Sequence, residues 1–290
     1  MGDLGQNFTP VVNGCAKYFL FEGLTLYIRY MIKVVLLGSG NVAHHFFNAL
    51  TGASGVQLVQ TYSRGPQPFS DVGPIVPHTN NLKELGTADV YIIAIKDEAI
   101  AQFSMKLKHL KGIVVHTSGS VPIHAMDPQL RRGVIYPVQT LSLHRKVDFR
   151  EVPLAIESEH EQDGLILSEL AHILSDKVYE LSSEKREKLH MAAVFANNFS
   201  NYMFIQASEL CLENDIPFDI LKPMILETGK KVLKLDPVDA QTGPARRNDQ
   251  EVIEKHLRDL QGTRKEIYRL LSKEITKLYQ NQESNHGKKL

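Results

Sequence analysis

Residues 34–46 read Val-Val-Leu-Leu-Gly-Ser-Gly-Asn-Val-Ala-His-His-Phe, and this stretch decides the expected fold. Its first four apolar residues predict a buried strand, and the glycines that follow predict a tight turn into a helix. Gly38 permits the turn, Gly40 lets the backbone approach a pyrophosphate, and Ala43 allows close helix–strand packing. A helix N-terminus at this point offers free N–H groups and partial positive charge to phosphates. The stretch therefore predicts dinucleotide binding by Gly38, Ser39, Gly40, Asn41 and Val42.

The bulk composition is that of an ordinary globular protein of 290 residues, with 43% hydrophobic and 23% charged residues. Its formal net charge is zero, which argues against a general nucleic-acid or anionic-membrane binder. Cys15 and Cys211 lie far apart and match no metal-ligand spacing, which favours a reducing compartment. We expect a cytoplasmic protein without a metal site, a nucleic-acid partner or a membrane span.

Strand and helix patterns alternate from residue 31 onward, which predicts parallel strands joined by crossovers. The expected fold class is α/β, with a doubly wound, mostly parallel Rossmann sheet followed by an all-α C-terminal domain. Ligands of such sheets bind beyond the carboxyl ends of the strands. The expected strands are 32–37, 56–62, 90–95, 112–116, 133–136 and 152–157, and the expected helices are 41–51, 81–86, 97–108 and 122–131.

This pattern divides the chain into four parts. Residues 1–30 form an N-terminal extension, expected to be weakly ordered or to lie upstream of the natural start. The alternative is a partner-binding or lid segment that uses its aromatic residues. Residues 31–160 form the predicted dinucleotide-binding domain, 161–280 a helical substrate and dimerisation domain, and 281–290 a polar tail.

The residues after the second strand favour NADP over NAD. An NAD site usually places Asp or Glu here for the ribose 2′-hydroxyl, and this chain has Ser63-Arg64 instead. Ser63 can donate to a 2′-phosphate, and Arg64 can pair with it and stack on adenine. The alternative is an exposed turn arginine ahead of Gly65-Pro66.

Two further strand ends carry candidate cofactor contacts. After the third strand, Asp97 is a plausible helix cap, and Lys96 is either a contact or a solvated loop lysine. After the fourth strand, hydroxyl groups and a histidine gather, although residues 117–120 could simply cap a helix. The predicted contacts at these two ends are Ala94, Ile95, Lys96, His116 and Ser118.

The second half of the chain is dominated by helices, expected at 161–176 and from Ser182 or Ser183 to about 213, with a possible strand at 177–181. The run 191–196 is apolar all round and is predicted to be buried. His190, Asn197 and Asn201 share one helical face, and a buried polar stripe needs partners. A substrate, a cofactor or another helix could supply them; a satisfied core histidine is the alternative for His190.

A turn with two arginines precedes the last helix. A helix is expected at 217–234, and Asp249 is placed to cap another at 250–280. Between them, Arg246 and Arg247 follow the turn Thr242-Gly243-Pro244, which suits a carboxylate or phosphate. The alternative is a pair of surface arginines bound to Asp249 or Glu251.

Taken together, these motifs resemble a known family of NADP oxidoreductases, in which a Rossmann-like domain precedes the domain of unknown function 2520. The resemblance covers residues 31–278, and its last two stretches are the most specific. The matching stretches are 37–43 (Leu-Gly-Ser-Gly-Asn-Val-Ala), 116–120 (His-Thr-Ser-Gly-Ser), 136–140 (Tyr-Pro-Val-Gln-Thr), 190–199 (His-Met-Ala-Ala-Val-Phe-Ala-Asn-Asn-Phe) and 242–249 (Thr-Gly-Pro-Ala-Arg-Arg-Asn-Asp).

The family is similar to pyrroline-5-carboxylate reductase, to deazaflavin-dependent NADP oxidoreductase and to the 6-phosphogluconate dehydrogenase group. The resemblance implies an NADP-binding domain, an all-helical C-terminal domain and a homodimer joined through helices. Many relatives carry His where this chain has Tyr136. The Lys and Asn four residues apart that hydroxyacid dehydrogenases use are absent, because Lys188 is followed at that spacing by Ala192.

The leading hypothesis is an NADP-dependent oxidoreductase that transfers hydride to or from a small carbonyl, imine or hydroxy substrate in the cleft between its domains. His190 would give or take the proton, because imidazoles titrate near neutral pH. Asn197 would orient the substrate or the nicotinamide, and Arg247 with Thr242, Gly243 and Pro244 would bind an anionic end. The alternatives are a non-catalytic NADP-binding sensor or scaffold and a deazaflavin-linked NADP reductase.

Overall fold

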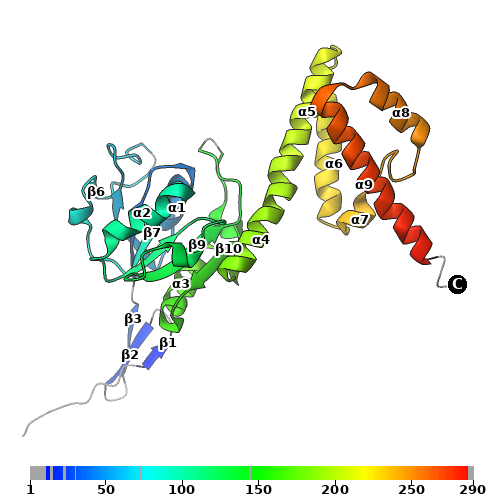
Figure 1. Cartoon of the computed structure of the whole chain (residues 1–290). Helices are drawn as coiled ribbons and strands as arrows, with labels where there is room; N and C mark the ends of the chain where they lie inside the picture. Colours follow the sequence, from blue (N-terminus) through cyan, green and yellow to red (C-terminus); the bar gives the residue numbers. More distant parts are fainter. Residues whose placement is uncertain are drawn as a thin grey trace, which may run out of the picture. The chain divides into compact units, whose positions relative to one another are not determined.

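The structure is a computed structural model. It describes the backbone of residues 11–13, 16–21, 24–29, 31–71, 73–143 and 145–286, and side chains within 31–281. The chain divides into two compact units, Met1–Asn198 and Phe199–Leu290, which are described separately (Figure 1).

An eight-stranded sheet forms the centre of the first unit, in the order β11-β10-β9-β8-β7-β4-β5-β6. Neighbouring strands run parallel except β9 and β10, which are antiparallel. The predicted doubly wound, mostly parallel sheet is thus confirmed. The strands are β4 (Ile32–Leu37), β5 (Val56–Tyr62), β6 (His78–Thr79), β7 (Val90–Ile93), β8 (Ile113–His116), β9 (Arg131–Pro137), β10 (Leu154–Ser158) and β11 (Val178–Glu180).

Both faces of this sheet are covered, which explains why β4 is apolar at nearly every position. Val34 and Leu36 pack into the core beneath α1 (Asn41–Gly52) and α3 (Glu161–Leu174). Val35 and Leu37 pack into a second core beneath α2 (Asp97–Ser104).

The central strands end level with one another. Leu37 at the end of β4 pairs with Tyr62 of β5 and Ile93 of β7, and Ile93 pairs with His116 of β8. The segments that follow these strands therefore emerge together at the carboxyl edge, where ligands of such sheets bind.

Two expected helices are shorter than their patterns suggest. The segment 122–131 contains only the 3₁₀ turn Ile123–Ala125, because Met126 is extended and β9 already begins at Arg131. The segment 81–86 is the 3₁₀ turn Leu82–Glu84, which Asn81 caps by accepting the Lys83 N–H.

Strands that the sequence did not predict occupy part of the N-terminal extension. Here β1 (Val11–Asn13), β2 (Ala16–Phe21) and β3 (Leu24–Arg29) form an antiparallel three-stranded sheet. The rest of the extension, to which the expectation of weak order also applied, lies outside the described residues.

The division between the units does not coincide with the expected boundary near residue 160. Helix α3 remains with the first unit because Leu167, Leu170 and Leu174 belong to the core under the sheet. Helix α4 (Ser183–Ala193) begins as predicted with Ser182 as its cap and leads directly into a π-helix (Val194–Phe199), within which the division falls.

The second unit is helical, as predicted. The expected helix at 217–234 consists of a 3₁₀ turn and α6, and the expected helix at 250–280 is broken into α8 and α9. The break follows from the extended backbone of Leu260 and the positive φ of Gly262 (55°), and Asp249 caps α8 as predicted. Its elements are α5 (Ser200–Glu213), the 3₁₀ turn Phe218–Leu221, α6 (Lys222–Val232), α7 (Pro237–Ala240), α8 (Gln250–Asp259) and α9 (Gly262–His286).

Across the described part of the chain, none of the helices combines the length and apolar character needed to cross a membrane.

Candidate functional site

The glycine turn after β4 lies between the ends of β5 and β7. The Gly38 N–H donates to the Tyr62 carbonyl oxygen at 2.9 Å. Its φ is 141°, and a Cβ built on Gly38 would lie 2.1 Å from the Ala94 carbonyl oxygen. Only glycine fits this position, both for its backbone conformation and for the space available.

The N-terminus of α1 is open. Gly40 occupies the cap position, no side chain caps the helix, and its first turn contains no acidic residue. A Cβ built on Gly40 would have no atom within 4 Å. The first N–H groups of this 12-residue helix are therefore available to an anion, which fits the pyrophosphate of a dinucleotide.

Asn41 begins α1 and connects it to the loop that follows β9. Its Nδ2 donates to the Leu141 carbonyl oxygen at 3.2 Å, and His45 Nε2 lies 3.1 Å from the Ser142 carbonyl oxygen. Ser39 and Asn41 are exposed and Val42 is half-buried.

Ser63 and Arg64 have different environments at the end of β5. Ser63 is buried, and its hydroxyl lies within hydrogen-bond distance of the Gly65 and Pro66 carbonyl oxygens, at 3.1 and 3.2 Å. Arg64 is exposed. Ser63 shapes the turn, whereas the Arg64 side chain is accessible to a ligand.

The loops after β7 and β8 are joined through Asp97. Its Oδ2 accepts hydrogen bonds from Ser118 Oγ at 2.7 Å and Ser120 Oγ at 2.8 Å. Asp97 is thus not the cap of α2, as the sequence suggested; that position belongs to Lys96, which is exposed. The carboxylate instead binds the neighbouring loop.

His116 is completely buried at the end of β8. Its Nδ1 accepts the Ser118 N–H at 3.2 Å, so the neutral ring carries its proton on Nε2, for which the described residues provide no hydrogen-bond partner. Burial, and then the charge of Arg186, lower the pKa of His116 to about 3. In this structure His116 supports the loop from within, and the predicted cofactor contact remains a prediction.

Tyr136 and His190 form a pair at the same edge. The Tyr136 hydroxyl near the end of β9 lies 3.2 Å from His190 Nδ1 on α4, and the rings meet edge to face with centroids 6.0 Å apart. Burial and the charge of Asp97 raise the pKa of Tyr136, while the charge of Arg186 lowers it. His190 therefore has a hydroxyl partner within its own unit.

Gly119 makes room for this pair. A Cβ built on Gly119 would lie 2.7 Å from Tyr136 Cζ and 2.8 Å from His190 Nδ1. The loop after β8, strand β9 and helix α4 thus meet at one point. Tyr136 was not among the site residues predicted from the sequence, although its position at the end of a predicted strand was a signal for it.

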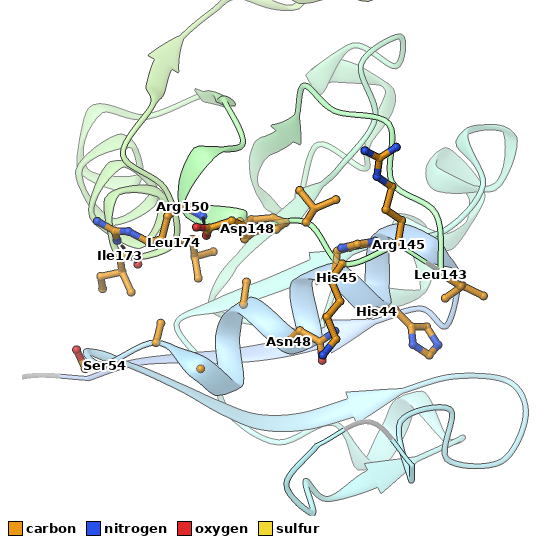
Figure 2. Close-up of a pocket in the computed structure, with 16 residues that line it drawn as sticks. His44, His45, Asn48, Ser54, Leu143, Arg145, Asp148, Arg150, Ile173 and Leu174 are labelled. Atoms are coloured by element: carbon orange, nitrogen blue, oxygen red, sulfur yellow. Dashed lines mark hydrogen bonds between the residues drawn. The ribbon is translucent and has the colours of Figure 1, made fainter. Parts of the chain in front are cut away.

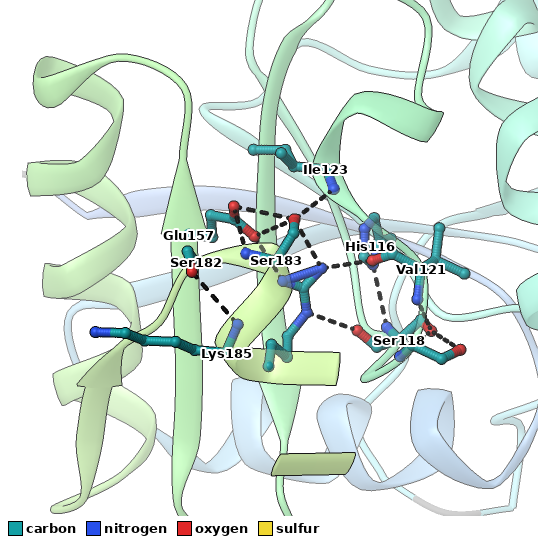
Figure 3. Close-up of polar contacts among 10 residues, drawn as sticks. His116, Ser118, Val121, Ile123, Glu157, Ser182, Ser183 and Lys185 are labelled. Atoms are coloured by element: carbon teal, nitrogen blue, oxygen red, sulfur yellow. Dashed lines mark hydrogen bonds and ion pairs between the residues drawn. The ribbon is translucent and has the colours of Figure 1, made fainter. Parts of the chain in front are cut away.

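Arg186, which is 1% exposed, binds helix α4 to the carboxyl edge of the sheet. Its Nη1 pairs with Glu157 Oε2, its Nε donates to the Ser118 carbonyl oxygen at 3.2 Å, and its Nη2 donates to that of Val121. Figure 3 labels these three partners. Ser183 adds a second attachment, since its Oγ donates to Glu157 and accepts the Ile123 N–H at 2.9 Å. The sequence did not predict this network.

The apolar run 191–196 was predicted to be buried, and this is wrong for the structure as described. Met191 is 50% exposed and Phe195 is 65% exposed. Asn197 is also exposed and lies in the π-helix. Because a π-helical turn contains more residues than an α-helical one, Asn197 does not continue the face of His190 as it would in an unbroken α-helix.

Arg247 and the turn Thr242-Gly243-Pro244 belong to the second unit. Arg246 packs over the Tyr279 ring at 5.0 Å, whereas Arg247 is exposed. Within the described residues neither arginine pairs with Asp249 or Glu251, the alternative considered above.

A hollow of about 770 Å³ lies along the outer side of α1. Figure 2 shows it between this helix and the loop that carries Arg145 and Asp148. None of the predicted cofactor or catalytic residues lines it. The hollow is therefore separate from the residues gathered at the carboxyl edge.

Comparison with known proteins places these features in a family. The model of the domain of unknown function DUF2520 matches residues 152–275. A "putative NADP oxidoreductase" from Bacteroides fragilis is 38% identical, with 85% of this chain and 98% of that chain covered and a TM-score of 0.75. No curated protein matches the chain.

More distant solved structures share the fold. A 1-pyrroline-5-carboxylate reductase from Streptococcus pyogenes is 13% identical, covers 85% of this chain and 99% of its own, and gives a TM-score of 0.58. A Plasmodium falciparum pyrroline carboxylate reductase with NADP bound is 11% identical, covers 86% of this chain and 98% of its own, and gives a TM-score of 0.56. The identity to the Bacteroides protein along nearly its whole length shows that the chain belongs to its family, in which a Rossmann-like domain precedes the domain DUF2520.

Proposed function

We propose that this protein is an NADP-dependent oxidoreductase that transfers hydride to or from a small carbonyl, imine or hydroxy substrate. The observation that carries the proposal is the Tyr136–His190 pair, whose polar atoms lie 3.2 Å apart at the edge where the open N-terminus of α1 also lies. A dinucleotide site and a proton-transferring side chain are the two parts that such a reaction needs.

The chain's residues would hold the dinucleotide in a defined way. The N–H groups at the start of α1 bind the pyrophosphate, and the exposed Arg64 binds the 2′-phosphate that distinguishes NADP from NAD. No carboxylate occurs within 63–66 to favour NAD. The bound dinucleotide supplies or accepts the hydride. The name of the Bacteroides protein and the NADP in the Plasmodium structure support this choice.

His190 would move the proton at Nε2. Its Nδ1 faces the Tyr136 hydroxyl, which can donate to a neutral imidazole and accept from a protonated one. The raised pKa of Tyr136 keeps the phenol protonated, so it remains a donor at neutral pH. The ring is thus held in both protonation states, as a general acid–base residue requires.

Two further roles are proposed for residues named from the sequence. Arg247, with the turn Thr242-Gly243-Pro244, binds an anionic end of the substrate, and Asn197 orients the substrate or the nicotinamide. Arg247 and Asn197 are exposed, and the Arg247 guanidinium makes no ion pair within the described residues.

We also propose that a second copy of the chain covers apolar residues of the helical unit. Among its described residues, the core cluster of this unit contains only Ala245, Ile253 and Leu257. Met224 and Leu233 are 62% and 85% exposed. So small a core rarely supports a unit of this size without association.

The test combines binding with turnover. NADPH and NADH are titrated by fluorescence, and NADPH oxidation is followed with a panel of keto acids and cyclic imines. We expect tighter binding of NADPH, turnover of at least one substrate, and loss of turnover by about 100-fold or more in His190→Ala with NADPH affinity retained. His124→Ala, on the 3₁₀ turn, is the control and should behave as wild type.

Three results would contradict this scheme. Unchanged turnover in His190→Ala would remove His190 from the mechanism. NADPH binding without consumption in any assay would instead support the non-catalytic sensor, which the missing Lys–Asn pair at Lys188 and Ala192 favours. Activity only after addition of a deazaflavin would support the deazaflavin-linked reductase.

A further inference from the structure

We propose that Arg186 is a positioning residue for the proposed reaction: its buried guanidinium fastens α4 to the loop after β8, and so holds His190 against Tyr136. This inference rests on the role of His190 proposed above. Two observations support it: the hydrogen bonds of Arg186 to Ser118 and Glu157 (Figure 3), and the close approach of Gly119 to Tyr136 and His190.

The Arg186 side chain is fully enclosed and strongly bound. It is 1% exposed, and a buried guanidinium without partners would be costly. Its partners come from three elements: Glu157 on β10, the Ser118 and Val121 carbonyl oxygens after β8, and the Ser183 hydroxyl one turn before it on α4. A shift of α4 would separate the guanidinium from its acceptors on β10 and in the loop after β8, so these contacts fix the position of the first turn of the helix.

The same network holds the helix of His190 and the Gly119 loop that lies against the Tyr136–His190 pair. Arg186 and His190 are four residues apart on α4, so their side chains lie on the same face of the helix. Ser118, whose carbonyl oxygen accepts from Arg186, directly precedes Gly119. A Cβ at Gly119 would come within 3.0 Å of both rings, so the loop, the phenol and the imidazole already lie at contact distance.

Four titratable groups lie on the elements around this pair, and the charges of two of them, Asp97 and Arg186, act on Tyr136. Asp97 lies at the start of α2, Glu157 on β10, Arg186 on α4 and His116 at the end of β8. The positive charge of Arg186 lowers the pKa of Tyr136, and the negative charge of Asp97 raises it. Loss of Arg186 should therefore change the ionisation of Tyr136 as well as the position of His190.

The test reads the His190 ring directly and needs no known substrate. Long-range ¹H–¹⁵N spectra of the full-length protein report which imidazole nitrogen carries the proton, with His190→Gln used for assignment. We expect one fixed tautomer with the proton on Nε2 in the wild type. In Arg186→Met we expect averaged tautomers, and the absorbance titration of Tyr136, assigned with Tyr136→Phe, should shift to higher pH.

A matched control is available on the adjoining strands. Arg132 pairs with Glu159, two residues beyond Glu157, and its Nη1 donates to the Met126 carbonyl oxygen. Arg132→Met should leave the His190 and Tyr136 signals unchanged. A second variant, Glu157→Gln, removes the charge of the acceptor while keeping its shape and provides an independent test should Arg186→Met fail to fold.

The outcomes separate the two proposals. Wild-type His190 signals in folded Arg186→Met or Glu157→Gln would overturn the positioning role, whatever the activity. Once a substrate is identified, Arg186→Met should lower kcat by about 100-fold, the effect of a roughly 1 Å misplacement, with the KM for NADPH unchanged. Displaced His190 signals combined with full activity in His190→Ala would confirm the positioning of the ring and refute its chemical role.

Discussion

At the scale of single residues, the structural role of Gly38 could be predicted from the sequence, whereas that of Gly119 could not. Gly38 belongs to a local motif, and its requirement for a φ of 141° is a property of the turn itself. Gly119 is needed because Tyr136 and His190 approach from elements far apart in the chain. The first glycine could be predicted; the second depends on how α4 packs on the edge of the sheet.

The imidazole of His116 should make folding stability depend on pH. Burial lowers its pKa from the ordinary 6.5 to about 3, so between these values the unfolded chain binds a proton that the folded protein does not. The stability contributed by the neutral ring is complete above pH 6.5 and is lost as the pH falls toward 3, by up to about 1.4 kcal/mol per pH unit.

Chemical denaturation between pH 7 and pH 4.5 measures this effect. His116→Asn keeps an acceptor for the Ser118 N–H but does not titrate, so its stability should fall less steeply than that of the wild type. Burial also lowers the pKa of His44, which contributes in the same direction in both proteins, so the two slopes are compared. Equal slopes would show that His116 does not titrate in this way.

At the scale of elements, the alternation of apolar patterns predicted the central strands and α1 because these are set by local spacing and by burial on both faces of the sheet. The π-helix Val194–Phe199 and the break between α8 and α9 could not be read from periodicity. The apolar residues keep a helical spacing through the π-helix and through the break, so the spacing alone gives no sign of either feature.

The link between the loops after β7 and β8 is testable through Asp97. Its carboxylate binds two hydroxyl groups of the second loop, and its charge raises the pKa of Tyr136. Asp97→Asn should therefore lower the pKa of Tyr136 and reduce stability by about 1 kcal/mol. Absorbance titration and denaturation measure the two effects.

The direction of the pKa change is the informative part, because it is opposite to that expected for Arg186→Met. Asp176→Asn removes a similar carboxylate, one paired with Arg150 on the surface, and should leave Tyr136 unchanged. A Tyr136 titration that does not move in Asp97→Asn would mean that the charge of Asp97 is not felt at the phenol.

At the scale of the whole molecule, the sequence predicted an α/β part followed by a helical part, and the structure has both. The change to helices near residue 160 reflects composition, whereas the unit boundary depends on packing. Helix α3 completes the core under the sheet and Arg186 fastens α4 to it, so both helices belong to the first unit.

The exposed apolar side chains of the helical unit lead to a prediction about assembly. Ile220, Met224 and Leu233 are 66%, 62% and 85% exposed, more than expected for side chains that a stable unit should bury. Light scattering should therefore give about twice the chain mass of 32.6 kDa. Met224→Glu would place a charge in the apolar contact and should yield monomers, since burying an unpaired carboxylate is costly.

The control for this variant is Leu165→Glu on α3, because Leu165 is 68% exposed but lies in the first unit. It should leave the mass unchanged. A wild-type protein that is monomeric at all concentrations would refute the proposed dimer. A Met224→Glu protein that keeps the wild-type mass while Leu165→Glu loses it would place the contact away from α6. The proposed association would bury residues that the helical unit alone exposes, so the unfolding midpoint of the wild type should rise with protein concentration. The midpoint of Met224→Glu should be lower and independent of concentration.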